Sequence, residues 1–287
     1  MNHIKSYPIG ASTCGDLPTE ALFAAYREAG ITHTEISCSV DVTPTLNFDA
    51  IGKLAEAYGV TVHSLHLPFS QAMDVSVTDS DARAEVVTFQ SELMKRGAAA
   101  GIRLFVIHPS SEPIEDEERA HRMACAKESL AIMAELAESL GVVLAVEDLP
   151  RTCLGNCSDE MLELLAAHSA LRSCLDTNHL LQEDIATYIG RVGNRIVTTH
   201  VSDYDFVNER HWLPGEGGQD FLAVLDALGK VDYKGIWMYE IGLKTPGTII
   251  RPRELTCADL ADNARTLFAG ARPAPFGRPI PNLGFWG

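Results

Sequence analysis

Acidic and imidazole side chains stand at the ends of apolar stretches in the second half of the chain. One apolar run ends on Asp176, and His179 follows three residues later. Three further apolar runs end in the same way, on Glu147, His200 and Glu240. A carboxylate or an imidazole at the mouth of an apolar strand costs free energy unless it is paired or holds a cation. We therefore expect these side chains to share one site.

Four of these groups, Glu147, Asp176, His200 and Glu240, close consecutive predicted strands at intervals of 29, 24 and 40 residues. A lone histidine at a strand end is more often a hydrogen-bonded structural residue. Three carboxylates that converge without a cation repel one another, however, so the set predicts a divalent metal ion. Three carboxylates and one imidazole favour Mn²⁺ as our first expectation, with Mg²⁺, Co²⁺ and Zn²⁺ as alternatives.

A repeated junction indicates the elements that must position these groups. A helix-like segment, a glycine and then a β-branched apolar run occur at Gly30, Gly59, Gly101 and Gly141. Glycine suits the left-handed residue that ends a helix, and the apolar run begins a strand. Four such junctions are typical of a βα repeat.

The full pattern predicts eight strands and eight helices. Strands are expected at about residues 4–11, 32–37, 60–67, 103–108, 142–147, 171–176, 195–201 and 234–241. Helices are expected at about residues 18–29, 48–58, 79–100, 115–140, 158–168, 182–191, 219–228 and 254–269, with Ser158 as the N-cap of the fifth.

This number of units in 287 residues predicts an α/β fold, a (β/α)8 TIM barrel built as a single domain. A doubly wound sheet is the alternative, but no glycine-rich dinucleotide turn follows the first strand. We expect the barrel to occupy residues 1–270 and a tail rich in proline and glycine to occupy residues 271–287.

The composition argues against several classes of partner. The net charge is 23 − 39 = −16, which opposes binding to nucleic acid or to an anionic membrane surface. No apolar run reaches transmembrane length and no signal-peptide core follows Met1, so we expect a cytoplasmic protein. The seven cysteines are scattered and odd in number, which indicates reduced thiols. A zinc role for Cys153 and Cys157 is the minor alternative.

Seven short motifs between Ser64 and Glu240 lie at predicted strand ends or in the following loops. They are Ser64-Leu65-His66-Leu67-Pro68, Val106-Ile107-His108-Pro109, Val146-Glu147-Asp148-Leu149-Pro150, Leu175-Asp176-Thr177-Asn178-His179, His200-Val201-Ser202-Asp203, Pro214-Gly215-Glu216-Gly217 and Tyr239-Glu240. Together they resemble the xylose isomerase-like TIM-barrel superfamily, particularly its sugar isomerase/epimerase branch.

The resemblance implies one divalent ion held by Glu147, Asp176, His200 and Glu240. It also implies that the two glutamates are the catalytic acid/base pair and that His179 contacts the substrate. The chemistry agrees, because a metal ion that binds a carbonyl and the adjacent hydroxyl acidifies the C–H between them. One carboxylate removes that proton to give a metal-bound enediolate, and the other returns it. We therefore expect a metal-dependent sugar isomerase/epimerase with a small-molecule sugar substrate, and the resemblance implies a homo-oligomer.

Four histidines are the expected substrate-binding residues: His66, His108, His179 and His211. His66 and His63 lie three residues apart, and we expect His66 to be the residue at the mouth of the barrel.

The loop after the seventh strand departs from the ketose 3-epimerases, which carry an arginine shortly after the strand-seven histidine. Here residues 203–206 contain no arginine, and the first is Arg210. The loop resembles instead the form Asp-x-His-x-x-Pro-Gly-x-Gly, with Glu209 in place of the aspartate and His211 directed into the mouth.

Other activities use the same residue types. The abasic-site endonucleases of the superfamily use three zinc ions, and nine positions here match their ligands: His66, His108, Glu147, Asp176, His179, His200, Glu209, His211 and Glu240. A zinc phosphoester hydrolase is therefore one alternative, although the net charge of −16 opposes a DNA substrate. A lyase or dehydratase that uses the same enolate is another, and a metal-dependent binding or scaffold protein is a third.

Five further side chains have two alternative places each in this pattern. Glu35 ends the second predicted strand and either lines the pocket or pairs with a basic group. Arg151 and Lys244 follow strands 5 and 8, where they either meet a phosphate or carboxylate of the substrate or, as we expect, lie at the surface. Phe69 and Trp212 either stack on a sugar or pack within their loops.

Overall fold

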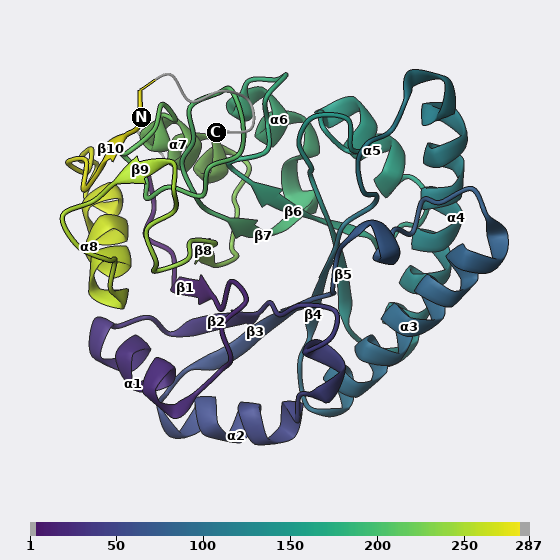
Figure 1. The fold of residues 1–287 in the computed structure, drawn as a ribbon, viewed down its shortest axis with the longest axis horizontal. Coiled ribbons are helices and arrows are strands. Elements are labelled where there is room, and N and C mark those ends of the chain that lie inside the picture. The colour runs from purple at the N-terminus through teal and green to yellow at the C-terminus, as the bar shows by residue number, and fades with distance from the viewer. Residues whose placement is uncertain (1–3, 282–287) are drawn as a thin grey trace.

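Eight parallel strands form a barrel that helices surround in the computed structural model, which describes residues 4–281 (Figure 1). The strands are β1 (Ile9–Ser12), β2 (His33–Ile36), β3 (Thr61–His66), β4 (Leu104–Ile107), β5 (Val143–Glu147), β6 (Arg172–Asp176), β7 (Ile196–His200) and β8 (Trp237–Tyr239). The helices are α1 (Glu20–Ala29), α2 (Phe48–Ala57), α3 (Ser80–Ala99), α4 (Asp116–Leu140), α5 (Ser158–Leu165), α6 (Ile185–Val192), α7 (Phe221–Lys230) and α8 (Cys257–Phe268).

The strands are neighbours in the order β7-β6-β5-β4-β3-β2-β1-β8, and a parallel bridge between Val201 and Tyr239 joins the two ends. The prediction of a single-domain (β/α)8 barrel is therefore confirmed. All eight strands point the same way, so their carboxyl ends open on one face of the barrel.

The glycine junctions act as predicted. Gly30 ends α1 with φ 81°, and the next amide, that of Ile31, donates to the carbonyl of Tyr26 at 2.9 Å. Gly141 ends α4 in the same conformation, with φ 66°. A residue with a Cβ is strained at such φ values, so glycine ends these helices at little cost and lets the next strand begin at once.

Several predicted element ends were wrong because side chains set them. Ser158 is the first residue of α5 rather than its N-cap, and its amide and hydroxyl both donate to Glu183 at 2.7 Å. α6 begins only at Ile185, because Asp184 accepts from the amide of Thr187. At α8, Thr256 and Asp259 form a capping box, so the helix starts later than predicted.

Most of the hydrophobic core lies between the barrel and the helices, and a smaller cluster fills the barrel interior. The interior cluster consists of Leu104, Val106, Ala145 and Cys174, from three adjacent strands. It packs the barrel below the level of the polar strand ends. None of the described helices has the length and apolarity needed to cross a membrane.

Part of the predicted tail pairs with the loop after β8. β9 (Ile249–Ile250) and β10 (Arg278–Pro279) form a two-stranded antiparallel sheet that was not predicted. Residues 282–287 of the tail lie outside the described residues, so the division at residue 270 remains a prediction.

Candidate metal centre and pocket

The last side chains of β5, β6 and β7 and the side chain directly after β8 come together at the floor of the barrel mouth. We call Glu147, Asp176, His200 and Glu240 the floor cluster. One potential ligand atom from each lies within 4.8 Å of the others. All four residues are buried, and Glu240, at 9% exposed, is the most accessible. The strand ends predicted to converge therefore do so.

The ring of His200 has an acceptor at each nitrogen. Its Nδ1 lies 2.9 Å from Oε1 of Glu147, and its Nε2 lies 3.0 Å from Oε1 of Glu35. A neutral imidazole has one N–H, so it can donate to only one of the two carboxylates. The second contact requires another positive charge, either a proton on the ring or a cation at Nδ1.

The two carboxylates of β5 and β6 have opposite electrostatic surroundings. Burial opposes ionisation of Glu147, but His200 and His108 outweigh it and hold its pKa well below the usual range. Burial raises the pKa of Asp176 well above its usual range, although the charge of His179 opposes this shift. Oδ2 of Asp176 is buried without a hydrogen-bond partner, although Oδ1 accepts from the amide of Asn178. Such an oxygen, aimed into the floor cluster, is what a divalent ion would satisfy.

The floor cluster therefore fits a divalent metal ion. It offers three carboxylates and one imidazole nitrogen, together with an unpartnered buried oxygen. The seven cysteines are all free thiols, and of these Cys174 belongs to a separate group with Glu147 and His200. A ligand set in which oxygen predominates favours a hard or borderline ion.

His66 and His108 approach the other oxygen of Glu147. Their Nε2 atoms lie 2.9 and 3.2 Å from Oε2 of Glu147. Nδ1 of His66 also faces the carbonyl of Leu67, at 2.9 Å. Burial lowers the pKa of His108, whereas Glu147 outweighs burial at His66 and raises its pKa. The ring of Phe69 stacks on His108 at 4.2 Å and, being 49% exposed, forms one wall of the pocket.

His179 and His211 lie on the opposite side of the floor cluster. His179 Nδ1 faces the carbonyl of Asp148 at 2.8 Å, and its Nε2 lies 3.1 Å from Oε2 of Glu209. The carboxylates of Asp176, Glu209 and Glu147 raise the pKa of His179 well above its usual range in spite of burial. His211 approaches Glu240, with Nδ1 3.2 Å from its carbonyl oxygen, and its half-exposed ring borders the pocket.

The loop that carries Glu209 and His211 is organised by Asp203. This carboxylate accepts from the amides of Gly215, Gly217 and Gln219 at 2.8, 2.9 and 3.1 Å. A Cβ at Gly217 would collide with Asp203, so the close turn requires glycine there. The glycines of the Pro-Gly-x-Gly form therefore close the turn around Asp203.

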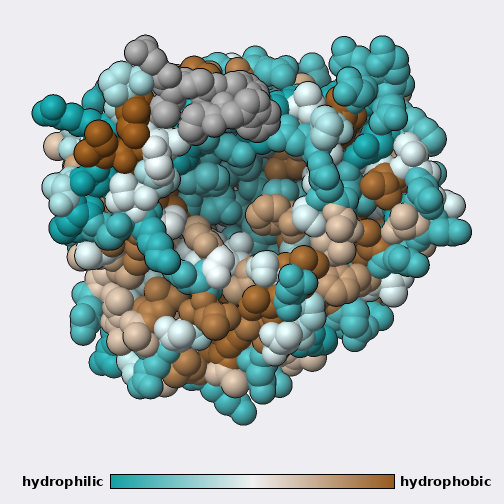
Figure 2. All heavy atoms as spheres, in the orientation of Figure 1, coloured by the Kyte–Doolittle hydropathy of each residue, from teal (hydrophilic) through white to brown (hydrophobic). Residues whose placement is uncertain are grey.

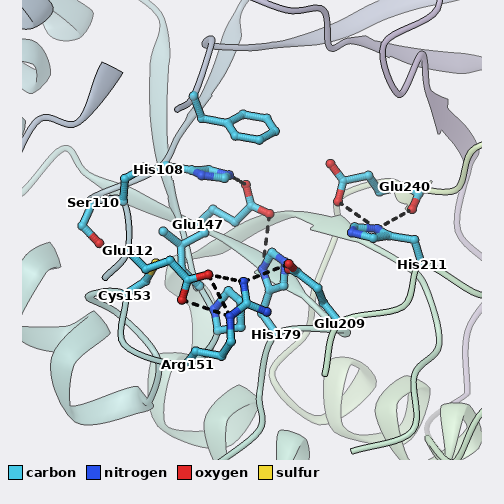
Figure 3. A pocket seen from close by; sticks show the side chains of 14 residues that line it. His108, Ser110, Glu112, Glu147, Arg151, Cys153, His179, Glu209, His211 and Glu240 are labelled. Carbon is cyan, nitrogen blue, oxygen red and sulfur yellow. Dashed lines mark hydrogen bonds and ion pairs between the residues drawn. The ribbon is translucent and has the colours of Figure 1, made fainter. Parts of the chain in front are cut away.

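Arg151 was expected at the surface, and this prediction was wrong. Its guanidinium lies at the rim of the pocket, where Nε donates to Glu112 at 2.8 Å and Nη2 donates to Glu209 at 2.9 Å. Nη1 donates to Asn208. We call Glu112, Arg151, Asn208 and Glu209 the rim clamp, and Figure 3 shows Arg151 between the two carboxylates. The clamp joins the loops after β4, β5 and β7.

Above the floor cluster is a pocket of about 230 Å³. Figure 2 shows the hollow in the molecular surface, with a hydrophilic interior and hydrophobic side chains along its lower edge. Its lining residues are Phe69, His108, Ser110, Ser111, Glu112, Glu147, Leu149, Pro150, Arg151, Cys153, His179, Glu209, His211 and Glu240. The volume and lining suit a small polyhydroxylated molecule.

The chain matches a family model described as xylose isomerase-like TIM barrel over residues 23–262. The chain belongs to this family. Among solved structures, a D-tagatose 3-epimerase-like protein has a TM-score of 0.78 at 19% identity, with 92% of this chain and 97% of that chain covered. D-psicose 3-epimerase from Clostridium cellulolyticum H10, solved with D-tagatose, has a TM-score of 0.72 at 19% identity and 89% coverage of both chains.

Two more relatives have low identity. The 3-keto-D-glucoside 4-epimerase from E. coli has a TM-score of 0.72 at 15% identity, with 93% of this chain and 100% of that chain covered. An uncharacterized protein of Methanocaldococcus jannaschii is 22% identical over 199 residues, which is 66% of this chain and 67% of its own length. The structural likenesses at these identities show the shared barrel.

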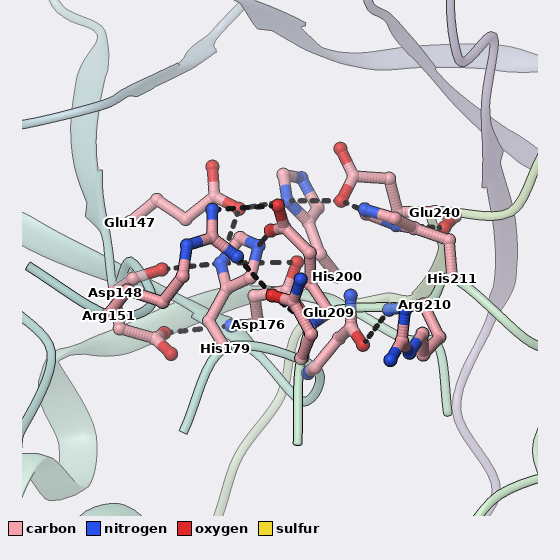
Figure 4. Close-up of polar contacts among 12 residues, drawn as sticks. Glu147, Asp148, Arg151, Asp176, His179, His200, Glu209, Arg210, His211 and Glu240 are labelled. Atoms are coloured by element: carbon pink, nitrogen blue, oxygen red, sulfur yellow. Dashed lines mark hydrogen bonds and ion pairs between the residues drawn. The ribbon is translucent and has the colours of Figure 1, made fainter. Parts of the chain in front are cut away.

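Within this xylose isomerase-like barrel, three side chains of the mouth were missed or left open by the sequence. Glu35 is fully buried and contacts His200, which Figure 4 shows between Glu147 and Glu240. Asp148 is also fully buried, and Oδ1 accepts from the amide of Asp176 at 2.8 Å. Burial raises the pKa of Asp148 to about 7. Its place beside Glu147 in an apolar run was the only signal for it. Trp212 packs within its loop, with Nε1 donating to Thr248.

Proposed function

We propose that this protein is a divalent-metal-dependent sugar isomerase or epimerase that moves a proton at the carbon next to a carbonyl. The observation that carries the proposal is the pairing of two carboxylates, Glu147 and Glu240, across one floor cluster that also offers Asp176 and His200. The structural neighbours support the same class, since they are a D-tagatose 3-epimerase-like protein, a D-psicose 3-epimerase and a 3-keto-D-glucoside 4-epimerase.

Glu147, Asp176, His200 and Glu240 would hold the ion. When bound, a divalent ion supplies charge that stabilises the oxyanion formed when the neighbouring C–H loses its proton. Glu147 or Glu240 accepts that proton, and the carboxyl group on the other side returns one. Their placement on different strands, β5 and the end of β8, lets them approach the substrate from different sides (Figure 3).

The surrounding side chains position the sugar. The imidazoles of His108, His179 and His211 border the pocket and can bond to its hydroxyl groups. Phe69 offers an exposed ring face against which the C–H side of a sugar can pack, and Leu149 adds apolar lining. His66 lies deeper, 1% exposed, so we assign it to holding Glu147 rather than to contacting substrate.

We further propose that the substrate is an uncharged sugar rather than a sugar phosphate or a sugar acid. Apart from the histidines, Arg151 is the cationic side chain among the described pocket-lining residues. Glu112 and Glu209 already engage its guanidinium. A phosphate at the rim would therefore meet two carboxylates and one arginine that is already paired, which is unfavourable.

A second candidate is a multinuclear metal phosphoester hydrolase. It is favoured by two more ligand groups beside the floor cluster: His66 with His108 and Glu147, and His179 with Glu209 and His211. The hydrogen bond from Arg151 to Glu209 weighs against a hydrolase. The guanidinium of Arg151 already neutralises the one carboxylate in the group of His179, Glu209 and His211.

The test combines metal counting with hydrogen exchange. Metal content per subunit is measured on protein purified without chelators, and free ketoses are then incubated with it in heavy water. One ion per subunit and deuterium at the carbon next to the carbonyl are expected. Two or three zinc ions, no deuterium incorporation and cleavage of phosphodiesters would instead establish the hydrolase. One ion without exchange would contradict proton transfer on sugars and favour a lyase acting on another carbonyl compound.

Three finer assignments belong to the same proposal. The oxygen-rich ligand set supports Mn²⁺ as the ion. A homo-oligomer is proposed from the family resemblance, and size-exclusion chromatography with light scattering measures it. A cytoplasmic location is proposed from the seven free thiols, which suit a reducing compartment.

A further inference from the structure

Glu35 is a buried carboxylate that the proposed reaction does not use. It is the third residue of β2 and is 0% exposed. Its Oε2 accepts a hydrogen bond from the hydroxyl of Ser64 on β3 at 2.8 Å. Nε2 of His200 lies 3.0 Å from its Oε1 and 3.2 Å from its Oε2. A carboxylate without a cationic partner is costly at such depth, so its position calls for an explanation.

The contact with Glu35 determines how His200 presents its ring. A carboxylate accepts hydrogen bonds and donates none, so Nε2 of His200 must carry the proton. In the neutral ring this leaves Nδ1 with its lone pair. Nδ1 is the nitrogen that faces the floor cluster, 2.9 Å from Glu147 and 3.7 Å from Glu240. The tautomer that Glu35 selects is therefore the one that can ligate an ion there.

We propose that Glu35 is a positioning residue for the metal centre, which fixes His200 with Nδ1 free to bind a divalent ion and thereby raises the affinity of the floor cluster for that ion. The inference rests on the proposed metal site. Ser64 completes the arrangement, because its hydroxyl holds the carboxylate against β3 and so sets its direction. A carboxylate that accepts the N–H of a metal-binding imidazole also makes the opposite nitrogen more basic, so that this nitrogen binds the metal ion more strongly.

A positioning role for Glu35 can be distinguished experimentally from a purely structural role. A structural counter-ion would affect folding stability but not the choice of tautomer in the metal-loaded protein. The test variant is Glu35→Gln, which keeps the size of the side chain but removes its charge and allows its amide to donate as well as accept. The matched control is Glu216→Gln, the same change at another fully buried glutamate, which pairs with Arg251 away from the floor cluster.

Affinity for Mn²⁺ is measured on metal-free protein by electron paramagnetic resonance of the free ion. Glu35→Gln should bind Mn²⁺ about 10–100-fold more weakly than the unsubstituted protein. Glu216→Gln should lose stability but keep its affinity for Mn²⁺. In ¹⁵N-histidine spectra of Zn²⁺-loaded protein, His200 should show one tautomer, protonated at Nε2, and Glu35→Gln should weaken that preference.

Each outcome bears on a different statement. Equal Mn²⁺ affinity in the unsubstituted protein and Glu35→Gln would overturn the role of Glu35 and leave the metal centre standing. Absence of Mn²⁺ and Zn²⁺ binding in the unsubstituted protein would overturn the metal centre and, with it, this inference. If Glu35→Gln does not fold, Ser64→Ala provides the test, because it keeps the carboxylate but removes one of its two bonds. Ser64→Ala should weaken Mn²⁺ binding by several-fold, and unchanged binding would count against the inference.

Discussion

Two histidines three residues apart on β3 have opposite surroundings. His66, at the mouth, directs one nitrogen at the carbonyl of Leu67 and the other at Glu147, each at 2.9 Å. The contact with Glu147 outweighs burial and raises the pKa of His66. His63 lies where β3 shifts register against β2, and its buried Nε2 has no hydrogen-bond partner. There burial dominates and lowers the pKa of His63 to about 4.

The difference shows what the mouth of the barrel is built to hold. A buried ionisable group that is left alone becomes neutral, as His63 does. At the mouth, His66, His179 and His200 each have acceptors at both nitrogens, so each site needs more positive charge than a neutral ring provides. The surrounding acceptors raise the pKa of all three rings, which favours their protonated forms, and a cation at the floor cluster would replace part of that charge.

The largest expected effect comes from removing one carboxylate of the floor cluster. In Glu240→Gln the side chain keeps its size but cannot accept or return the proton. Turnover and deuterium exchange should fall by about 10²–10⁴-fold, the contribution of a positioned general acid or base. Circular dichroism should show folding retained, because the backbone bond from residue 240 to Val201 does not depend on the side chain. The exposed Glu254, changed to Gln, is the control, and full turnover in Glu240→Gln would contradict the assignment.

Removal of the ion should destabilise the fold. The carboxylates of Glu147, Asp176 and Glu240 repel one another without a cation, and a ligand at 100 times its Kd stabilises a protein by about 2.7 kcal/mol. Chelation should therefore lower Tm by roughly 5–10 °C, and Mn²⁺ should restore it. Calorimetry measures both steps. The Tm of Asp176→Asn should change neither on chelation nor on addition of Mn²⁺. An equal Tm of the unsubstituted protein with and without the ion would show that the floor cluster does not bind it.

The barrel could be predicted from the sequence because its signals are local. Gly30 and Gly141 mark helix ends within a few residues, and the alternation of helix and strand leads directly to a closed parallel sheet. The floor cluster followed from topology, since the carboxyl ends of parallel strands meet on one face. What was predicted is the location of these side chains; their catalytic and binding roles remain predictions.

Contacts between distant segments could not be predicted in the same way. Arg151 is an isolated cation in the sequence, and its partners Glu112 and Glu209 lie 39 and 58 residues away in other loops. The partner of Glu35 is His200, which lies 165 residues later in the chain. A long charged side chain is by default expected at the surface, and only the three-dimensional arrangement of loops overrides that expectation.

The isolated histidine predicts a pH effect on stability. The unfolded chain binds a proton at His63 below about pH 6.5, whereas the folded protein binds it only near pH 4. The contribution of neutral His63 to the free energy of unfolding is therefore complete above pH 6.5. It is lost as the pH falls toward 4, by about 2–3 kcal/mol at the lower end. His63→Gln should remove that part of the pH dependence in urea unfolding. His33→Gln, at the neighbouring and more accessible ring, should remove less, and identical curves for His63→Gln and the unsubstituted protein would contradict the pKa shift.

The smallest expected effect concerns the rim clamp, where charges are paired as at the mouth but lie closer to solvent. Glu112→Gln removes the carboxylate that accepts from Nε and Nη2 of Arg151, which makes Nε available to an anion although Glu209 still accepts from Nη2. The unsubstituted protein should prefer a free ketose to its terminal phosphate ester, and the variant should shift the ratio of kcat/KM values toward the ester by about tenfold, or about 1.4 kcal/mol.

The control for this change is Glu115→Gln, at an exposed position just before α4 that makes no capping bond. Both variants lose one negative charge, so a general change in the field of the protein would shift both ratios equally. A shift confined to Glu112→Gln would place the selection at Arg151. An unsubstituted protein that prefers the phosphate ester would show instead that the guanidinium leaves its carboxylates when substrate binds, and the proposal of an uncharged sugar would be wrong.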